Sequence, residues 1–367
     1  MKTCVLGASI LAIVFAAAMP ASAQQSIAAE GSFKSPLPFF KDLKAWDPNY
    51  KVPRTPDGKP DLQGTWSSAS LTTMSRGGQN GTGSFGLVIP QDTIDKLTAN
   101  SYYNQRLAND NKRTNEAATA GDGQGGGDVK GYNNFWIDPG SEYAKVNGEY
   151  RSSWVVEPAD GRVPRASNGN ARLNMAARST NTGPEVRTLG DRCLIPFGSQ
   201  GGPPMTNAMY NNHIQIVQTP DHILLDIEMN HDARIVRIQK PGETEKRFPE
   251  PVKRWFGDSI GWWEGDTLVV ETRNVHPIQE RAGAVPISYE SGKVTERFRR
   301  VSDKEIDYQY TVEDPKYYKS AWKGQMPLRL STEKVFEYAC HEGNYALPGI
   351  LRGMAEGRDT ALAADGE

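Results

Sequence analysis

A thiol, an imidazole and a carboxylate follow one another at Cys340, His341 and Glu342, close to the end of this 367-residue chain. All three groups are metal ligands, and a thiol beside an imidazole is the pairing of a cysteine nucleophile with its base. The stretch EYACHEGNY therefore admits three interpretations: a metal site, a thiol nucleophile, or a structural segment that happens to carry a histidine.

The position of the other cysteines narrows these interpretations. Cys4 lies in an N-terminal segment with Lys2, an apolar run over 5–18 and the small residues 21–23, which is typical of a secretory signal peptide. Once residues 1–23 are removed, only Cys193 and Cys340 remain, and a periplasmic or secreted location would favour a disulfide between them. His341 and Glu342 then become the catalytic candidates of the stretch.

The chain has five histidines, and their spacing does not predict a metal site. Zinc ligands usually come in close pairs such as HExxH or CxxC, which this sequence lacks. No metal is therefore expected, although His213, His231 and His341 could still meet in space. Nor does the sequence contain GxxxxGK[ST] or a strand–helix–strand alternation, and its GxGxxG matches lie in Gly-rich stretches expected to be loops, at 75–86 and 119–131, so we expect no nucleotide cofactor.

The motif EMNHDARIV contains the next candidate, His231. Strand alternation over 222–229 predicts one apolar face that ends at His231, at the rim of the core. There His231 could be a general base tuned by a carboxylate, or it could simply pack. Asp232 and Arg234 suggest an ion pair, with substrate anchoring by Arg234 as the alternative.

Aromatic and polar residues around two loops suggest a substrate site. Asp258 is a further catalytic carboxylate candidate, and Gly-Asp hairpin chemistry explains the acidic residues after it. Large flat rings and polar groups in two loops and in the C-terminal stretch are expected to contact the substrate: Tyr210, Asn211, His213, Trp255, Trp263 and Tyr345. Core packing of the rings and hydrogen bonding within the loops are the alternative roles.

Short alternating stretches predict a mainly β fold, an antiparallel meander or lipocalin-like barrel with a few short helices and long Gly/Pro-rich loops. The expected strands are 213–218, 222–229, 233–238, 266–275, 293–301, 305–312 and 333–340, and helices are expected from Pro90 onward and over 168–178. We expect an extended arm over 24–60, a single barrel-like domain over 61–350 with an insertion at about 75–150, and a polar tail over 351–367.

Several stretches together resemble a large family of secreted bacterial proteins, most of which have no assigned activity: RTPDGKPDLQGTW, LGDRCL, YNNHIQIVQTPD, EMNHDARIV, WFGDSIGWWEGDTLVVET, TERFRRV, YTVEDP and YACHEGNY. The resemblance covers nearly the whole mature chain and implies a barrel-like β domain, without a catalytic assignment. Members often have another residue at the position of His213. The Gly-x-Trp of PDLQGTW also resembles the opening strand of a lipocalin.

The formal net charge of −2 argues against nucleic acid or an anionic membrane as a partner. The stretch 257–261 matches GxSxG, but it lies between two expected strands and no helix pattern follows it, so we expect no nucleophile elbow there. Without a spare thiol, His and Asp/Glu acid–base chemistry remains. We expect a cofactor-independent lyase for elimination, ring opening or retro-aldol cleavage of a small plant-derived aromatic compound. A lipocalin-like binding protein is the alternative, and a glycoside- or metal-dependent hydrolase is the second.

Overall fold

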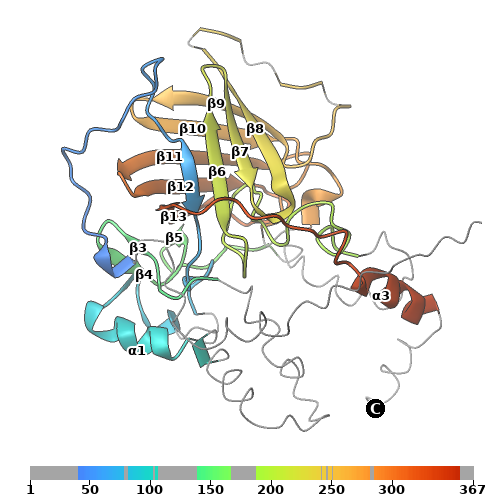
Figure 1. Cartoon of the computed structure of the whole chain (residues 1–367), viewed down its shortest axis with the longest axis horizontal. Coiled ribbons are helices and arrows are strands. Elements are labelled where there is room, and N and C mark those ends of the chain that lie inside the picture. Colours follow the sequence, from blue (N-terminus) through green and yellow to red (C-terminus); the bar gives the residue numbers. More distant parts are fainter. Residues whose placement is uncertain are drawn as a thin grey trace, which may run out of the picture. The chain divides into compact units, whose positions relative to one another are not determined.

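Nine β-strands close into a β-barrel in the computed structural model of the chain (Figure 1). Strand β13 pairs with β1 and so joins the two ends of the sheet. The fold is mainly β, as the sequence predicts. The barrel strands in spatial order are β1 (Gly64–Ser67), β6 (His213–Gln218), β7 (His222–Ile227), β8 (Asp232–Ile238), β9 (Asp258–Glu264), β10 (Thr267–Arg273), β11 (Lys293–Ser302), β12 (Glu305–Glu313) and β13 (Trp322–Ser331).

The structure describes residues 40–77, 82–101, 104–105, 139–166, 187–240, 242–244, 247–249, 251–281 and 285–355. The expected signal peptide, the start of the arm, the helix over 168–178 and most of the tail lie outside these ranges.

An odd number of strands cannot alternate in direction all the way around a closed barrel, so one neighbouring pair must be parallel. That pair is β8 and β9, in which Val236 lies opposite Ser259, and the long connection 239–257 brings the chain back to the same end. All other barrel neighbours are antiparallel. The barrel therefore departs at one seam from a simple up-and-down meander.

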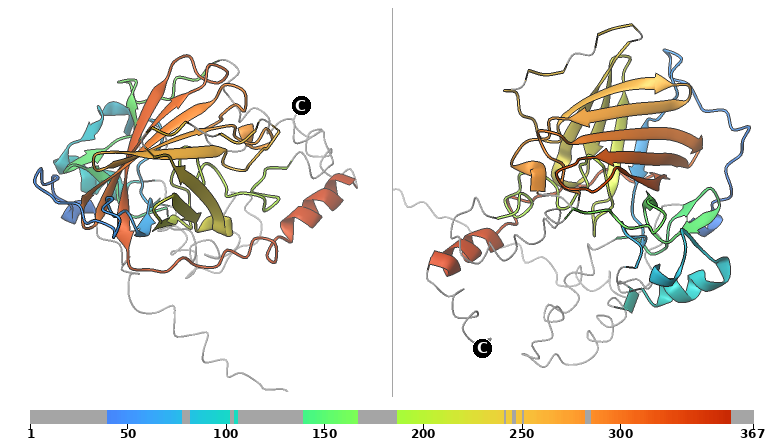
Figure 2. Two further views of the ribbon diagram at one scale, coloured as in Figure 1. Left: turned by 90° about the horizontal axis from the view of Figure 1, so that it is seen from above. Right: turned by 180° about the vertical axis from the view of Figure 1, so that it is seen from behind.

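Figure 2 shows the barrel strands from two further sides. Large buried side chains fill the inside of this barrel. Inward residues alternate with outward ones along each strand, as strand pleating requires. The largest buried inward side chains are at most 2% exposed: Trp66, Phe298, Tyr308, Tyr310 and Trp322. Tyr310 and Trp322 meet edge to face with ring centroids 5.7 Å apart. The interior is thus a packed core.

One charged pair lies within this core. The guanidinium of Arg234 donates to both carboxylate oxygens of Glu296, and also to the hydroxyl oxygens of Ser259 and Thr272. Tyr308 donates to Glu296 over 2.6 Å and accepts from the backbone N–H of Met205 over 2.8 Å. This network satisfies the buried charges and fixes the loop around Met205 to the barrel interior.

Smaller elements surround the barrel in the described part of the chain. Strand β5 (Val155–Glu157) pairs with the start of β13 on the edge opposite to β12, and a separate sheet has the order β2 (Val88–Ile89), β4 (Glu149–Arg151), β3 (Lys145–Val146). The helices are α1 (Ile94–Ala99) and α3 (Ala346–Ala355), with 3-10 turns η2 (Phe40–Asp42), η3 (Thr82–Ser84), η4 (Gln91–Thr93), η7 (Met229–His231) and η8 (Gln279–Arg281). No described helix is both long and apolar enough to span a bilayer.

The strand expected over 333–340 is wrong. Strand β13 occupies the place between β12 and β1, so the closed barrel offers the following residues no edge to pair with. They instead form an extended strap across the outside of β6 and β7 (Figure 1). The sequence pattern misses β13 because Gly324 and Pro327 interrupt it, and both residue types are rare inside strands. Strand β9 is also missed.

Candidate functional site on the outer wall of the barrel

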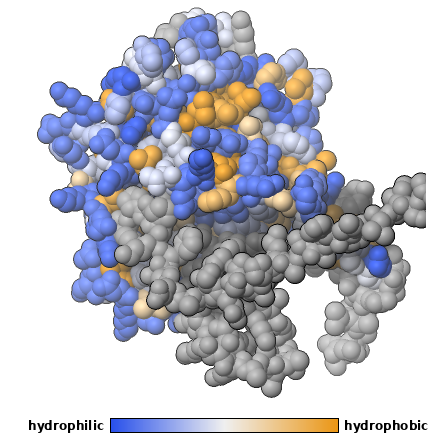
Figure 3. Space-filling view, viewed as in Figure 1, coloured by the Kyte–Doolittle hydropathy of each residue, from blue (hydrophilic) through white to orange (hydrophobic). Residues whose placement is uncertain are grey.

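The outward residues of β6, β7 and β8 form an ordered surface. Cross-strand pairing places Val217 opposite Leu224 and Leu224 opposite Ile235, which makes an apolar row across three strands. Val217 and Ile235 are 38% and 46% exposed. Figure 3 shows hydrophobic side chains gathered over this part of the molecule. Next to the row on β7 comes the outward carboxylate of Asp226, followed two residues later by that of Glu228.

The turn between β7 and β8 has a backbone that few residues adopt. Asn230 and His231 both have a left-handed conformation, with φ of 65° and 51°. Consecutive non-glycine residues in this region store strain, which is found most often at functional sites. This turn also breaks the strand alternation. His231 is therefore exposed and does not continue the apolar face, contrary to the expectation from the sequence.

Asp232 follows directly and carries an unusual carboxyl group. Burial, together with the charge of Asp226, raises its pKa to about 7. Its Oδ2 is buried and has no hydrogen-bond partner among the described residues. Burial also raises the pKa of Asp226, although the neighbouring His231 opposes that shift. The turn thus combines one exposed imidazole with a carboxyl group that can hold or release a proton near neutrality.

A histidine–carboxylate pair lies beside this turn. His213 and Glu228 face each other across β6 and β7, with His213 Nδ1 3.0 Å from Glu228 Oε2. Burial alone would raise the pKa of Glu228, but hydrogen bonds from His213 and Phe336 and the charge of His213 outweigh it and hold the pKa below its usual range. Glu228 is therefore an anion that orients the imidazole of His213.

The strap covers this pair, and its far end is covalently fixed. We define the strap as residues 332–340. The backbone N–H of Phe336 donates to Glu228 Oε1 over 3.2 Å, and Tyr338 stacks on Tyr210 with ring centroids 6.3 Å apart. At Cys340 the strap ends in the disulfide to Cys193, which confirms the expected pairing.

Two of the expected site residues are already engaged in structural bonds. Asp258 is 3% exposed, pairs with Arg237 over 2.5 Å and accepts the backbone N–H of Phe248 with its other oxygen. Arg234 is paired with Glu296 inside the barrel, so its ion-pair partner comes from β11 and the expected pairing with Asp232 is not formed. Neither group faces the turn as a ready proton donor or anchor.

The remaining expected residues spread over several surfaces. Trp255 stacks on His276 with centroids 4.3 Å apart, and Trp263 packs against the core from a partly buried position. His341 and Glu342 are exposed, and Tyr345 is 84% exposed. Tyr210 and Asn211 lie in the loop before His213, where Gln200 donates to both of their backbone carbonyls. Among these residues, His213 contacts Glu228 at the start of the β7–β8 turn, whereas Tyr210 contacts the strap through Tyr338.

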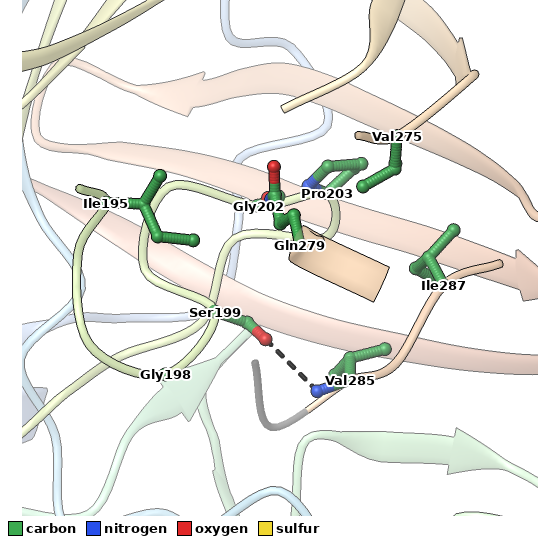
Figure 4. A pocket seen from close by; sticks show the side chains of 9 residues that line it. All are labelled: Ile195, Gly198, Ser199, Gly202, Pro203, Val275, Gln279, Val285 and Ile287. Atoms are coloured by element: carbon green, nitrogen blue, oxygen red, sulfur yellow. Dashed lines mark hydrogen bonds between the residues drawn. The ribbon is translucent and has the colours of Figure 1, made fainter. Parts of the chain in front are cut away.

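A small pocket lies between the loop around 195–203 and the segment 275–287 (Figure 4). Its volume of about 10 Å3 has room for about one water molecule. Ser199 Oγ points to the backbone N–H of Val285 and accepts its hydrogen bond over 3.1 Å. The side chain of Gln279 bridges Phe256 N–H and Gly202 O. The pocket is part of the packing of this end.

Sequence reasoning named His231 but did not select Asp226, Glu228 or Asp232 as site residues. The sequence does contain a pattern that could have identified them, because these three carboxylates surround Asn230–His231 within the seven residues 226–232. Glu296 gives no such signal, since its partner Arg234 is brought near only by barrel closure.

No group of three or more His, Cys, Asp and Glu residues in the described ranges could hold a metal ion. No model of a known protein family matches the chain, and no curated protein matches it either.

Proposed function

We propose that the chain is an extracytoplasmic acid–base enzyme, a lyase that cleaves a C–C or C–O bond by elimination, ring opening or retro-aldol chemistry. Each of these reactions needs one group to remove a proton and another to deliver one. The β7–β8 turn offers an exposed imidazole at His231 and a carboxyl group at Asp232.

The observation that carries this proposal is the pKa of Asp232, raised to about 7 by burial and by Asp226. A general acid or base works best when its pKa lies near the working pH, because both protonation states are then populated. Asp232 Oδ2 has no hydrogen-bond partner in the described part of the chain, so no hydrogen bond to that oxygen favours the ionised form.

The surroundings of the turn favour an apolar, ring-shaped substrate. The row of Val217, Leu224 and Ile235 lies on one side of Asp226, and the 58% exposed Phe336 of the strap lies next to Glu228 on the other. The carboxyl groups of Asp226 and Glu228 lie in between, which disfavours anionic substrates. A neutral aromatic compound, such as a hydroxylated plant product, fits this combination.

The extracytoplasmic location rests on the expected signal peptide and on the disulfide between Cys193 and Cys340, since disulfides persist in oxidising compartments. Periplasmic and secreted locations are equally compatible with both.

A lipocalin-like binding protein is the competing function, because the barrel closure is compatible with it. Lipocalins hold their ligand inside the barrel, whereas large side chains fill this interior. A binding protein of this fold would therefore have to use the outer wall, where the proposed site lies.

Incubation of the purified mature protein with a library of aromatic compounds and aromatic glycosides, read by mass spectrometry, tests the proposal. We expect a product with wild type, and loss of turnover with retained binding in Asp232→Asn and His231→Gln. Binding without any product from any library member would instead support the binding protein.

A further inference from the structure

The strap is held at both ends and clamped near its middle. Its first end continues from β13 at Ser331, and its second end is fixed by the disulfide at Cys340. Between them, Glu333 lies near His213, Phe336 donates to Glu228 and Tyr338 stacks on Tyr210. Because the ends are tethered, loss of the middle contacts would lift the strap without releasing it.

The middle clamp consists of one imidazole between two carboxylates. His213 Nδ1 lies 3.0 Å from Oε2 of Glu228, the residue after β7, and His213 Nε2 lies 3.8 Å from Glu333 Oε2 on the strap. The carboxylates are 2% and 28% exposed, and the imidazole is 13% exposed. From β1, the residue opposite His213 is the uncharged Ser67, and Asp226 is the next outward residue on β7. The other charged residues of the strap, Lys334 and Glu337, are exposed.

The protonation state of His213 decides whether this clamp attracts or repels. A neutral imidazole donates one N–H, and Glu228 takes it, so the lone pair of Nε2 faces the carboxylate of Glu333. That Nε2 is buried and lacks a hydrogen-bond partner in the described part of the chain. A protonated imidazole has two N–H groups, and it can donate to Glu228 and attract Glu333 at the same time.

We propose that the strap is a pH-dependent cover over the outer wall of β6 and β7, closed when His213 is protonated and loosened when His213 is neutral. Closure buries the His213–Glu228 pair and holds Tyr338 against Tyr210. Opening exposes this pair and the segment of wall between Tyr210 and Glu228. The device depends on ion pairing alone and does not rest on the proposed enzymatic activity.

Hydrogen–deuterium exchange of the strap, read by mass spectrometry on disulfide-intact protein, tests this directly. Imidazoles change charge between about pH 5 and 8, so exchange is compared near those limits after correction for the intrinsic pH dependence of the exchange rate. We expect protection of residues 332–339 to fall about threefold or more from the lower to the higher pH, the scale of a partly exposed ion pair. The amide of Phe336, which donates to Glu228, should report it most clearly.

Two variants and one control separate the clamp from other titrations. Glu333→Gln removes the charge that only the protonated imidazole attracts, so its strap should exchange at low pH as fast as the wild-type strap does at high pH. His213→Gln should lose the pH dependence, whereas His222→Gln, an exposed histidine at the start of β7, should keep it. Equal wild-type protection at both pH values, or an unchanged pH dependence in Glu333→Gln, would overturn the proposal. Since Glu333 is partly exposed, that variant keeps the test valid even if His213→Gln does not fold.

Discussion

The carboxylate of Asp226 raises the pKa of Asp232 across the end of the β7–β8 pair. Burial is the larger cause and Asp226 the second, so removal of the Asp226 charge should lower the pKa of Asp232 from about 7 without restoring an ordinary value. Asp226→Asn tests this, with 13C NMR titration of labelled aspartate carboxyl groups as the measurement. An unchanged Asp232 titration in the variant would show that the two groups do not interact.

Substitution within the buried ion pair of Arg234 and Glu296 should greatly reduce the stability of the barrel. Glu296→Gln leaves a buried guanidinium without its counter-charge, and breaking a buried pair in this way costs about 3–5 kcal/mol of unfolding free energy. Urea unfolding measures the loss. Glu264→Gln, which breaks the exposed pair with Arg297, is the matched control and should cost less than about 1 kcal/mol. Equal losses of unfolding free energy in the two variants would contradict a larger contribution from the buried pair.

Glu305 should make the fold less stable as the pH rises. Burial raises its pKa to about 7, with Asp307 adding to the shift and the hydrogen bond from Trp46 opposing it. The unfolded chain ionises this group first, so the stability present at low pH is lost between about pH 4.5 and 7.

Glu305→Gln keeps an acceptor for Trp46 but cannot ionise. It should therefore be more stable than wild type at pH 8, by up to about 3 kcal/mol, and equal to it near pH 4. Urea unfolding at both pH values checks this, with Glu313→Gln on the same strand as control, because the Glu313 side chain is 42% exposed. A variant that is less stable than wild type at pH 8 would refute the predicted sign.

The disulfide between Cys193 and Cys340 closes a sequence separation of 147 residues. Replacing both cysteines by serine should cost about 2–5 kcal/mol of unfolding free energy, since long loops gain entropy when the bridge is removed. The same variant should show faster hydrogen exchange over the strap than over β11 and β12. Uniform loss of protection across the barrel would mean that the bridge does not act mainly on the strap.

Local patterns predicted a large part of this fold. Strands such as β6 and β11 have regular alternation and clear turns, so their limits come close to the expected ones. β13 depends on barrel closure, which overrides the unfavourable Gly324 and Pro327. The strap shows the opposite case, in which a strand-like pattern finds no free edge.

The candidate site was only partly predictable. His231 could be named from its motif, but its exposure depends on the left-handed backbone of Asn230, which no side-chain pattern records. The raised pKa of Asp232 depends on burial, and the bond between His213 and Glu228 depends on strand register. These properties arise only when the chain has folded.

The most direct test of the proposed acid–base site is the turnover rate of Asp232→Asn on the compound that the library identifies as substrate, beside wild type and the exposed control Asp221→Asn. We predict a fall of about 100-fold or more in kcat for Asp232→Asn, the usual contribution of a general acid or base, with Asp221→Asn unchanged. Full activity of Asp232→Asn would contradict the central claim that this carboxyl group transfers the proton.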